Sequence, residues 1–372
     1  MRIVIAGGGT GGHLFPGIAI AQEFMRKDPD NRVLFVGTGK PFEVEVLDRA
    51  GFPHHRIASE GIKGRKLWQK AAAVWKVPGA ILASIGILWK FKPDLVIGVG
   101  GYSAGPVATG AWLMRKKIAL QEQNLLPGIT NRMLAAMADR IFVSFEESTA
   151  HFDAGKVRVS GNPVREEVRR LSEEPPRADR DKPFTVLIAG GSQGAHGINT
   201  AVIDALEYIR EKDRIRFIHQ TGKKDEQDVQ QSYLRHGIPC TAAAFFMDMP
   251  SRMEAADLVI CRAGATTVAE IAAMGKAAIF VPFPHAADNH QVLNARALEA
   301  AGAAEMILEK DLSGRSLADR IEYYRTHRSE LSQMAEAAGA HGRPQAAAEI
   351  VEECYRLVAE EKEGKRDRRK EG

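Results

Sequence analysis

Two glycine-rich loops hold the residues whose types and spacing could do chemistry. Residues 7–13 read GGGTGGH and residues 190–195 read GGSQGA. Each loop follows a short apolar run and precedes a helical pattern, so it would bring backbone N–H groups and a helix N-terminus close to an anion. Ser192 could add a hydroxyl donor in the second loop. We therefore expect two phosphate cradles and two phosphate-bearing substrates.

Neither loop has the context of a common nucleotide motif. The first satisfies G-x-G-x-x-G through Gly7, Gly9 and Gly12, but a dinucleotide site would also need Asp or Glu at the end of the second strand. That strand ends in VGTGK (36–40), without an acid. No Gly-Lys-Ser/Thr follows the second loop, so it is not a Walker A loop. The pattern argues against NAD.

The elements that must position these loops follow an α/β pattern. Short apolar, β-branched runs alternate with helical stretches, which is typical of parallel sheets covered on both faces. We expect strands at residues 3–6, 33–36, 95–99, 118–120, 141–145, 184–189, 216–220, 258–261 and 277–281.

The chain also resembles itself, because IAGG at 5–8 recurs at 188–191. The pattern predicts two Rossmann-like domains, residues 1–162 and 163–342, facing each other across a cleft. The Pro- and charge-rich residues 172–182 read as a linker. We expect a helix at about 343–358, which could pack back on the first domain. Residues 360–372 are a charge run that we interpret as a solvated, frayed tail.

Composition narrows the class of protein. The 372 residues are 45% hydrophobic and 26% charged, as in a soluble globular protein of two domains. A net charge of +4 does not predict nucleic-acid binding. Cys240, Cys261 and Cys354 show no metal-ligand spacing and are odd in number, so we expect reduced thiols in a cytosolic protein. No signal-peptide pattern is present, and the longest apolar run, 77–89, is too short to cross a bilayer.

Seven segments together point to one family. They are GGGTGGHLFPG (7–17), GVGGYSAGP (98–106), QEQNLLPGITNR (121–132), GNPVR (161–165), GGSQGA (190–195), CRAGATTVAE (261–270) and PFPHAADNHQVLNA (282–295). In this order they closely resemble the MurG family, bacterial N-acetylglucosaminyltransferases of glycosyltransferase family 28. The resemblance covers residues 1 to about 355.

The resemblance implies a GT-B fold and an inverting sugar transfer in peptidoglycan synthesis, and hence a part in cell-wall growth, cell shape and division. The donor would be UDP-GlcNAc. The acceptor would be the C4 hydroxyl of MurNAc-pentapeptide on undecaprenyl pyrophosphate (lipid I), and the product would be β-1,4-linked lipid II. No cofactor is implied. Cell-wall synthesis proteins are further candidate partners.

The resemblance also assigns the donor site. Glu270 would accept two ribose hydroxyls, and Ala265, Thr266 and Thr267 would donate to the diphosphate. Ordinary roles at the start of a helix remain the alternative. Gln291 and Asn294, which share a helix face, would read sugar hydroxyls, or would be a plain polar face. Further donor-side candidates are Thr10, Gly11, Gly12, Asn124, Arg165, Ser192, Phe246 (through its backbone) and Arg262.

The catalytic base has two candidates. His13 directly follows the first glycine loop, and histidine titrates near neutral pH, so it could take the proton of the attacking sugar hydroxyl. Alternatively it would bind a pyrophosphate as a cation. Glu122 is the rival base. The family commonly has His where this chain has Gln121, so that position carries no base here. Tyr102 and Asn199 are expected on the acceptor side.

Two Asp-x-Asp strings are the candidates for a metal site. The Asp-x-Asp strings at 28–30 and 179–181 adjoin neither glycine loop, so we interpret both as surface and expect a metal-independent enzyme.

Residues 61–92 hold seven basic residues and no acid. This is the pattern of an interfacial segment on anionic lipid, here the cytoplasmic face of the inner membrane; a buried helix with a basic shoulder is the alternative. The residues expected to face the membrane are Trp68, Trp75, Ile81, Leu82, Ile85 and Trp89.

Three other functions remain open at this point. A UDP-GlcNAc 2-epimerase would need no lipid-facing segment. A related glycolipid synthase would use a diacylglycerol acceptor, although the ordered motifs favour lipid I. A non-catalytic membrane scaffold of cell division would not need both glycine loops and Glu270.

Overall fold

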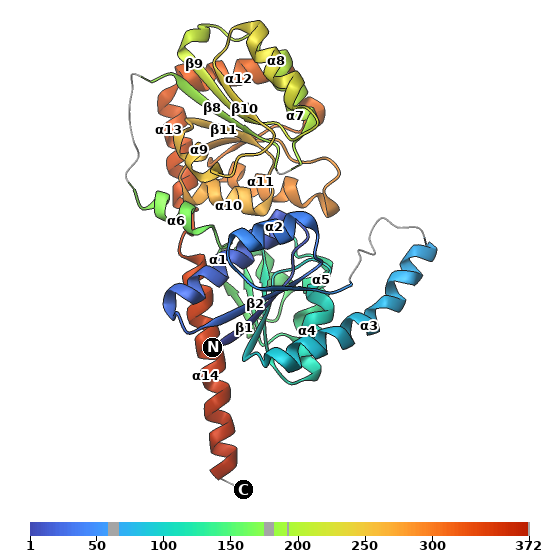
Figure 1. Ribbon diagram of the computed structural model, residues 1–372. Helices are drawn as coiled ribbons and strands as arrows, with labels where there is room; N and C mark the ends of the chain where they lie inside the picture. Colours follow the sequence, from blue (N-terminus) through green and yellow to red (C-terminus); the bar gives the residue numbers. More distant parts are fainter. Residues whose placement is uncertain (59–66, 175–181, 192, 371–372) are drawn as a thin grey trace. The chain divides into compact units, whose positions relative to one another are not determined.

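The computed structural model describes residues 1–58, 67–174, 182–191 and 193–370, with the backbone alone for 67–76, Ala287 and 361–370 (Figure 1). Packing divides the chain into two units. The first consists of Met1–Glu166 and Gln345–Gly372, and the second of Glu167–Pro344. The chain therefore leaves the first unit after Glu166 and returns to it with its last helix.

The first unit is built on a parallel sheet of seven strands in the order β3-β2-β1-β4-β5-β6-β7. Ile3 of the central strand β1 lies beside Val33 of β2 and Leu95 of β4. The strands are β1 Arg2–Ala6, β2 Arg32–Gly37, β3 His54–Arg56, β4 Leu95–Gly98, β5 Lys117–Glu122, β6 Arg140–Val143 and β7 Val157–Val159.

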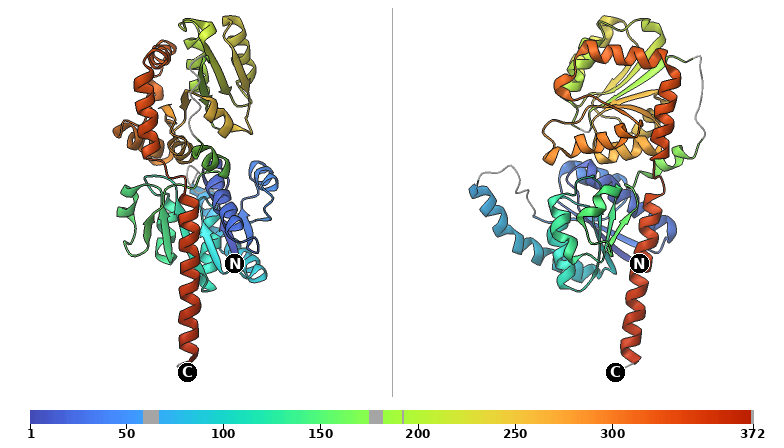
Figure 2. Two further views of the ribbon diagram at one scale, coloured as in Figure 1. Left: turned by 90° about the vertical axis from the view of Figure 1, so that its left-hand side faces the viewer. Right: turned by 180° about the vertical axis from the view of Figure 1, so that it is seen from behind.

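Helices cover both faces of this sheet, as the views in Figure 2 show. Side chains of a strand alternate between faces. Ile3 and Ile5 join the core under α1, α2 and α14, while Val4 and Ala6 join the core under α3, α4 and α5. The helices are α1 Gly11–Lys27, α2 Pro41–Arg49, α3 Leu67–Phe91, α4 Ala104–Leu113, α5 Ile129–Leu134 and α14 Ala346–Lys370, with 3-10 turns η1 Ala135–Met137 and η2 Glu146–His151.

The last helix, α14, packs on the first unit. Ile350, Cys354 and Leu357 are buried against α1 and its neighbours. Arg140 of β6 adds an ion pair to Glu353 at 3.1 Å. The expectation of a frayed tail from residue 360 is wrong, because α14 continues to Lys370. Residues 350–358 repeat apolar side chains at helical spacing, and the charged residues after them extend the same helix.

The second unit repeats the plan with six parallel strands in the order β10-β9-β8-β11-β12-β13. One face is covered by α7, α8 and α12, and the other by α9, α10 and α11, with α13 contributing to both cores. The strands are β8 Phe184–Ala189, β9 Ile215–Gln220, β10 Cys240–Ala243, β11 Leu258–Cys261, β12 Ala277–Phe280 and β13 Glu305–Met306. The helices are α6 Glu166–Ser172, α7 His196–Ala205, α8 Glu226–His236, α9 Met249–Ala255, α10 Ala265–Ala273, α11 His290–Ala300, α12 Gly314–Thr326 and α13 Arg328–Ala340, with 3-10 turns η3 Lys212–Arg214, η4 Ala287–Asn289 and η5 Glu309–Asp311.

Local sequence signals account for the ends of these helices. Helix α12 begins with a capping box, in which the Ser313 hydroxyl accepts from the Ser316 N–H at 3.1 Å and the Ser316 hydroxyl accepts from the Ser313 N–H at 3.1 Å. Helix α8 ends at Gly237, whose φ of +64° is left-handed and therefore suits glycine.

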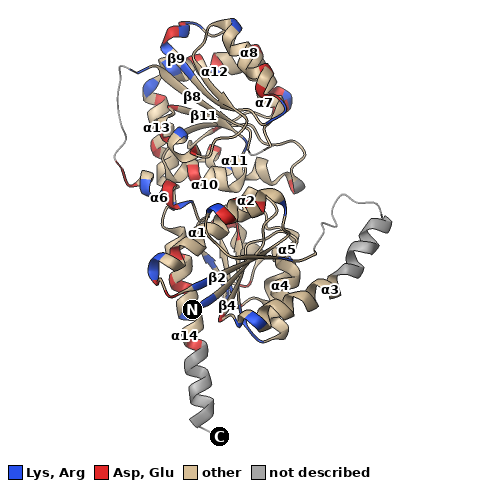
Figure 3. Cartoon of the chain, viewed as in Figure 1, with Lys and Arg blue, Asp and Glu red and all other residues tan. Residues whose placement is uncertain are grey.

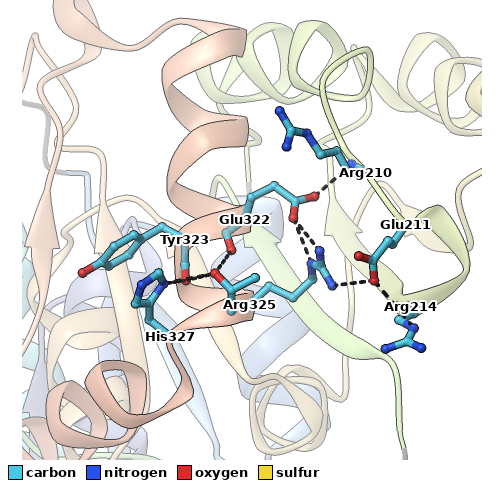
Figure 4. A network of polar contacts seen from close by, with 8 residues as sticks. Arg210, Glu211, Arg214, Glu322, Tyr323, Arg325 and His327 are labelled. Carbon is cyan, nitrogen blue, oxygen red and sulfur yellow. Dashed lines mark hydrogen bonds and ion pairs between the residues drawn. The ribbon is translucent and has the colours of Figure 1, made fainter.

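A polar network stabilises the second unit away from its glycine loop (Figure 4). Arg325 of α12 pairs with Glu322 at 2.8 Å and with Glu211 at 3.2 Å. Glu322 also accepts from the backbone N–H of Arg210 at 2.9 Å. These residues fix the turn that leads into the amino end of β9. That is the opposite end of the strand from the predicted site, so the network is part of the scaffold.

Candidate functional site

The two glycine loops lie at the switch points of the two sheets. In the first unit β1 and β4 are neighbours, but the chain goes from β1 outward to β2 before it returns to β4. In the second unit β8 and β11 are related in the same way. Open parallel sheets bind ligands outside the carboxyl ends of the strands at such points. The loops after these four strands are residues 7–10, 99–103, 190–195 and 262–264.

In the first unit the two switch-point loops touch through their backbones. A Cβ on Gly7 would lie 2.5 Å from the Gly100 carbonyl oxygen, and a Cβ on Gly101 would lie 2.9 Å from the Gly8 carbonyl oxygen. Gly101 also has a φ of +80°. Glycine is therefore required here for close approach and for backbone conformation.

A buried carboxylate that the sequence analysis did not predict holds the first loop. Glu43 of α2 accepts from the Gly9 N–H at 3.0 Å and from the Thr38 hydroxyl at 2.9 Å. A Cβ on Gly37 would collide with Glu43 at 1.6 Å. The N–H of Gly9 therefore serves the fold. Any anion at this loop would rest on the first turn of α1, where Thr10, Gly11 and Gly12 lie.

His13 lies at the meeting point of these loops. Its Nδ1 is 3.1 Å from Oε1 of Gln123, which follows β5. A Cβ on Gly100 would lie 2.9 Å from the same Nδ1. Tyr102, two residues after Gly100, is 48% exposed. The fold thus brings His13 and the predicted acceptor-side Tyr102 to the carboxyl ends of the strands in the first sheet.

Glu122 has an environment that does not favour a catalytic base. Its carboxylate is 1% exposed. It accepts from the backbone N–H groups of Asn124 at 3.0 Å and Gly128 at 2.9 Å, and from the Asn131 side chain at 2.9 Å. The Asn124 side chain also donates to it, at 3.3 Å. Glu122 therefore organises the turn after β5, and Asn124 helps it to do so.

Arg165, at the end of the first unit, lies over the ring of Phe15 in α1, with its guanidinium carbon 5.1 Å from the ring centroid. This contact connects the GNPVR segment to the helix that carries His13.

In the second unit, α10 gathers four predicted donor-site residues. Gly264 is the N-cap, Ala265, Thr266 and Thr267 form the first turn, and Glu270 lies in the second turn, 4% exposed. The first N–H groups of a helix have no partner within the helix and carry the positive end of its dipole. A diphosphate at this terminus would be electrostatically favoured.

The predicted sugar-binding residues Gln291 and Asn294 both contact the backbone of neighbouring loops. Gln291 accepts from the Phe283 N–H at 2.9 Å. Asn294 has no exposed surface, and its amide donates to the Ala263 carbonyl at 3.4 Å. Asn294 therefore connects α11 to the turn before α10.

Arg262 and Phe246 are likewise engaged within the second unit. Arg262 donates to the Val281 and Pro282 carbonyls at 3.1 and 3.2 Å and pairs with Glu309 at 2.5 Å. These contacts hold the guanidinium, which was predicted to bind phosphate or uracil, against the segment after β12. The Phe246 N–H donates to Oε1 of the buried Gln220 at 2.9 Å, and its ring belongs to the core.

Gln220 is a second positioning residue that the sequence patterns did not reveal. Its Nε2 donates to the Gly191 carbonyl at 2.9 Å, so one amide joins the glycine loop to the Phe246 segment. Ser192 of that loop lies outside the described residues.

Asn199, which was predicted on the acceptor side, is buried inside the second unit. Its amide donates to Asp225 at 2.8 Å, and its oxygen faces His219 Nε2 at 3.0 Å. Burial lowers the pKa of His219 to about 3, so its ring is neutral. Burial opposes ionisation of Asp225, but hydrogen bonds from Asn199 and His196 outweigh it and lower the pKa of that carboxyl.

The three cysteines are free, as expected. Burial raises the pKa of Cys240 to about 12 and also raises the pKa values of Cys261 and Cys354. Thiols in such surroundings are poor nucleophiles. In the described part of the chain, no group of three or more His, Cys, Asp or Glu is placed to hold a metal ion.

Helix α3 presents part of the predicted membrane-facing set. Leu82 and Trp89 are 69% and 71% exposed. Ile81 and Ile85 are half-buried, and Ile85 lies close to Gly110 of α4. The side chains of Trp68 and Trp75 lie outside the described residues. None of the helices described combines the length and apolar content needed to span a membrane.

The sheets, their order and their switch-point loops define a two-domain α/β protein with the GT-B fold. Sequence models give the family: the glycosyltransferase family 28 N-terminal domain matches residues 3–143, and the C-terminal domain of that family matches residues 185–350.

Curated relatives agree with this match. One from Syntrophus aciditrophicus is 47% identical, covering 96% of this chain and 99% of its own, and one from Geobacter sulfurreducens is 43% identical, covering 97% and 100%. Both are named UDP-N-acetylglucosamine–N-acetylmuramyl-(pentapeptide) pyrophosphoryl-undecaprenol N-acetylglucosamine transferase. The crystal structure of Acinetobacter baumannii MurG is 31% identical, with a TM-score of 0.75 over 94% of this chain and 98% of that one. The chain belongs to the MurG family within glycosyltransferase family 28.

More distant structures share the fold alone. The UDP-GlcNAc 2-epimerase of Neisseria meningitidis, bound to UDP-GlcNAc, is 13% identical with a TM-score of 0.69, covering 96% of this chain and 100% of that one. The epimerase alternative is therefore not favoured.

Proposed function

We propose that this chain transfers N-acetylglucosamine from UDP-GlcNAc to the C4 hydroxyl of lipid I, giving β-1,4-linked lipid II for peptidoglycan synthesis. The observation that carries the proposal is the identity of 42–47% with eight curated transferases of that name, over at least 96% of this chain. An epimerase or a related glycolipid synthase is the weaker alternative.

His13 is the proposed catalytic base. Its ring lies at the carboxyl ends of β1, β4 and β5, and the exposed Tyr102 belongs to the loop after β4. Nε2 of His13 takes the proton of the acceptor hydroxyl while that oxygen attacks the anomeric carbon of the donor sugar. The bond from this carbon to the β-phosphate oxygen breaks, and the electron pair leaves with UDP. Attack opposite the leaving group inverts the α-linked sugar to a β-linkage.

The start of α10 is the proposed site of the donor diphosphate. The N–H groups of its first turn, Ala265, Thr266 and Thr267, would stabilise the charge that develops on the leaving UDP. Glu270 lies one turn further on and is proposed to bind the ribose. This arrangement supplies electrostatic stabilisation from the protein itself, which supports a transfer that needs no metal.

Gln291, Ser192, Arg165 and the first turn of α1 remain donor-side proposals. Asn294, Arg262, Asn124 and Glu122 are proposed to act by positioning. Asn294 holds the turn before α10, and Arg262 holds the turn after β12. Glu122 and Asn124 hold the turn after β5.

The exposed side of α3 and α4 is the proposed membrane contact, at the cytoplasmic face of the inner membrane. The two helices pack together. Leu82 and Trp89 of α3 and Trp112 and Leu113 of α4 are all more than half exposed. Basic residues lie at the ends of these helices (Figure 3), and Lys90, Lys92 and Arg115 are exposed. Tryptophan beside lysine on an apolar helix face suits a surface of anionic lipid.

Product analysis tests the reaction. The full chain would be incubated with UDP-GlcNAc and a short-chain lipid I analogue, and the product examined by mass spectrometry and NMR. We expect the analogue to gain one N-acetylhexosamine in a β-linkage. Recovery of unchanged analogue together with epimerised UDP-sugar would contradict the proposal and favour the epimerase.

A further inference from the structure

We propose that Gln123 fixes the tautomer of His13, and that this makes Nε2 the proton-accepting atom. The inference deepens the proposed function and rests on it, because it assigns a positioning residue to the base. It begins from the single hydrogen bond described for the His13 ring, between Nδ1 and Oε1 of Gln123 at 3.1 Å.

The backbone determines which way the Gln123 amide points. Its Nε2 donates to the Val99 carbonyl at 2.8 Å and lies 3.4 Å from the Gln121 carbonyl. Both partners can only accept, so the nitrogen of the amide must face them. The oxygen Oε1 must then face His13, and an amide oxygen can only accept. Nδ1 of His13 therefore carries a hydrogen.

A second and a third amide lock the first. Nε2 of Gln123 also donates to Oε1 of Gln121, and Nε2 of Gln121 donates to Oδ1 of Asn162 at 3.2 Å. The exposures of Gln121, Gln123 and Asn162 are 0%, 1% and 4%. Buried amides have no bulk water to replace a lost partner, so reversing one of them would leave several groups unpaired.

The position of this hydrogen determines the state of the other ring nitrogen of His13, Nε2. A neutral imidazole carries one N–H, so when Nδ1 is protonated Nε2 has a free lone pair. After Nε2 accepts the proton of the acceptor hydroxyl, Nδ1–H still donates to Gln123 and the ring keeps its orientation. The amides transfer no proton. Their hydrogen bonds only orient the ring and select its tautomer, as a partner of one histidine nitrogen determines the state of the other.

The position of Gln121 fits this role. Its side-chain amide can accept a hydrogen bond through Oε1 while it donates another through Nε2. In this structure it does both, because Oε1 accepts from Gln123 and Nε2 donates to Asn162.

The test is the tautomer itself. Nitrogen-15 NMR of the full chain with labelled histidine reports which ring nitrogen carries the hydrogen, and a His13→Gln variant identifies the His13 signals. At a pH where the ring is neutral, we expect Nδ1–H in the wild type. A wild-type ring with hydrogen on Nε2 would overturn the proposal.

A variant then connects the tautomer to the rate. Gln123→Met keeps the side-chain length and removes the acceptor, so the Nε2–H form should become populated and kcat should fall roughly 10- to 100-fold, within the range of a general base. KM for UDP-GlcNAc should change by less than about twofold, because ground-state binding of the donor is not affected. Gln230→Met, which removes an exposed amide from α8, is the matched control and should retain wild-type values.

Two outcomes separate this inference from the proposed function. Retention of the Nδ1–H tautomer and of wild-type kcat in Gln123→Met would overturn the role of Gln123. An Nδ1–H tautomer in a wild-type chain that does not transfer sugar would leave the role of Gln123 in place and contradict the proposed function.

Discussion

The imidazole of His13 lies directly against the backbone of Gly100. A Cβ built on Gly100 would lie 2.9 Å from Nδ1 and 3.0 Å from Cε1 of that ring. Gly100 also has a φ of +89°, which side-chain-bearing residues rarely adopt. Of the two loops at the switch point, one therefore leads into the helix that carries the proposed base, and Gly100 of the other lies against the ring of that base.

Gly100→Ala should displace the ring of His13. We expect kcat to fall by at least roughly tenfold, because small misplacements of a reacting group are costly. Gly302→Ala is the matched control, since Gly302 has a φ of +66° with no neighbour within 4 Å of a built Cβ. Both variants should lose stability from backbone strain, by about 1–2 kcal/mol. Equal kcat values in the two variants would contradict the contact.

Glu122→Gln should act on stability more than on proton transfer. The variant replaces one acceptor oxygen by an NH₂ group that must face N–H donors, and we expect a loss of about 2 kcal/mol in the free energy of unfolding. Urea denaturation against the exposed control Glu147→Gln measures it. If Glu122 were the base, the variant would instead keep wild-type stability and lose nearly all activity.

His219 should make the second unit sensitive to acid. Its pKa is about 3 in the folded chain because of burial, against about 6.5 for an ordinary histidine. Between these values the unfolded chain binds the extra proton, so stability is full above pH 6.5 and is lost as pH falls toward 3. The contribution is about 1.4 kcal/mol for each pKa unit. Denaturation between pH 7 and 4 should show a shallower loss in His219→Gln; an unchanged slope would count against this assignment.

The membrane proposal predicts a change in lipid binding without a change in chemistry. Leu82→Glu with Trp89→Glu should reduce sedimentation with vesicles containing anionic lipid, because the exposed apolar face becomes charged. Turnover of a short-chain, soluble acceptor should stay the same. Leu234→Glu, at an 80% exposed leucine of α8, is the control and should bind vesicles like the wild type. An equal loss of vesicle binding in both variants would contradict a membrane contact through α3.

The sequence predicted the interior of both sheets and missed their edges. The nine apolar runs correspond to β1, β2, β4, β5, β6, β8, β9, β11 and β12, while the strands that were not predicted, β3, β7, β10 and β13, lie at the four sheet edges. A central strand is buried on both faces and must be apolar throughout. An edge strand such as His54–Arg56 pairs on one side only, so its composition carries little signal.

The site was predictable where chemistry requires a residue type in a fixed local context. The glycine loops, His13 and the first turn of α10 are of this kind. Glu43, Gln123 and Gln220 act across distances in the fold, through contacts between separate loops, and no local pattern reveals that. Asn199 and Arg262 lie in or near the motifs, yet their side chains bind other residues of the second unit. The sequence could not reveal these partners.

Acceptor-dependent release of UDP tests the central claim most directly. The full chain would be given UDP-GlcNAc, a short-chain lipid I analogue and EDTA, and compared with His13→Ala. We expect release of UDP only when the analogue is present. The release should be undiminished by EDTA and lower by roughly 10²–10⁴ in His13→Ala. Absence of release from a chain that binds UDP-GlcNAc, or a His13→Ala variant as fast as the wild type, would contradict it.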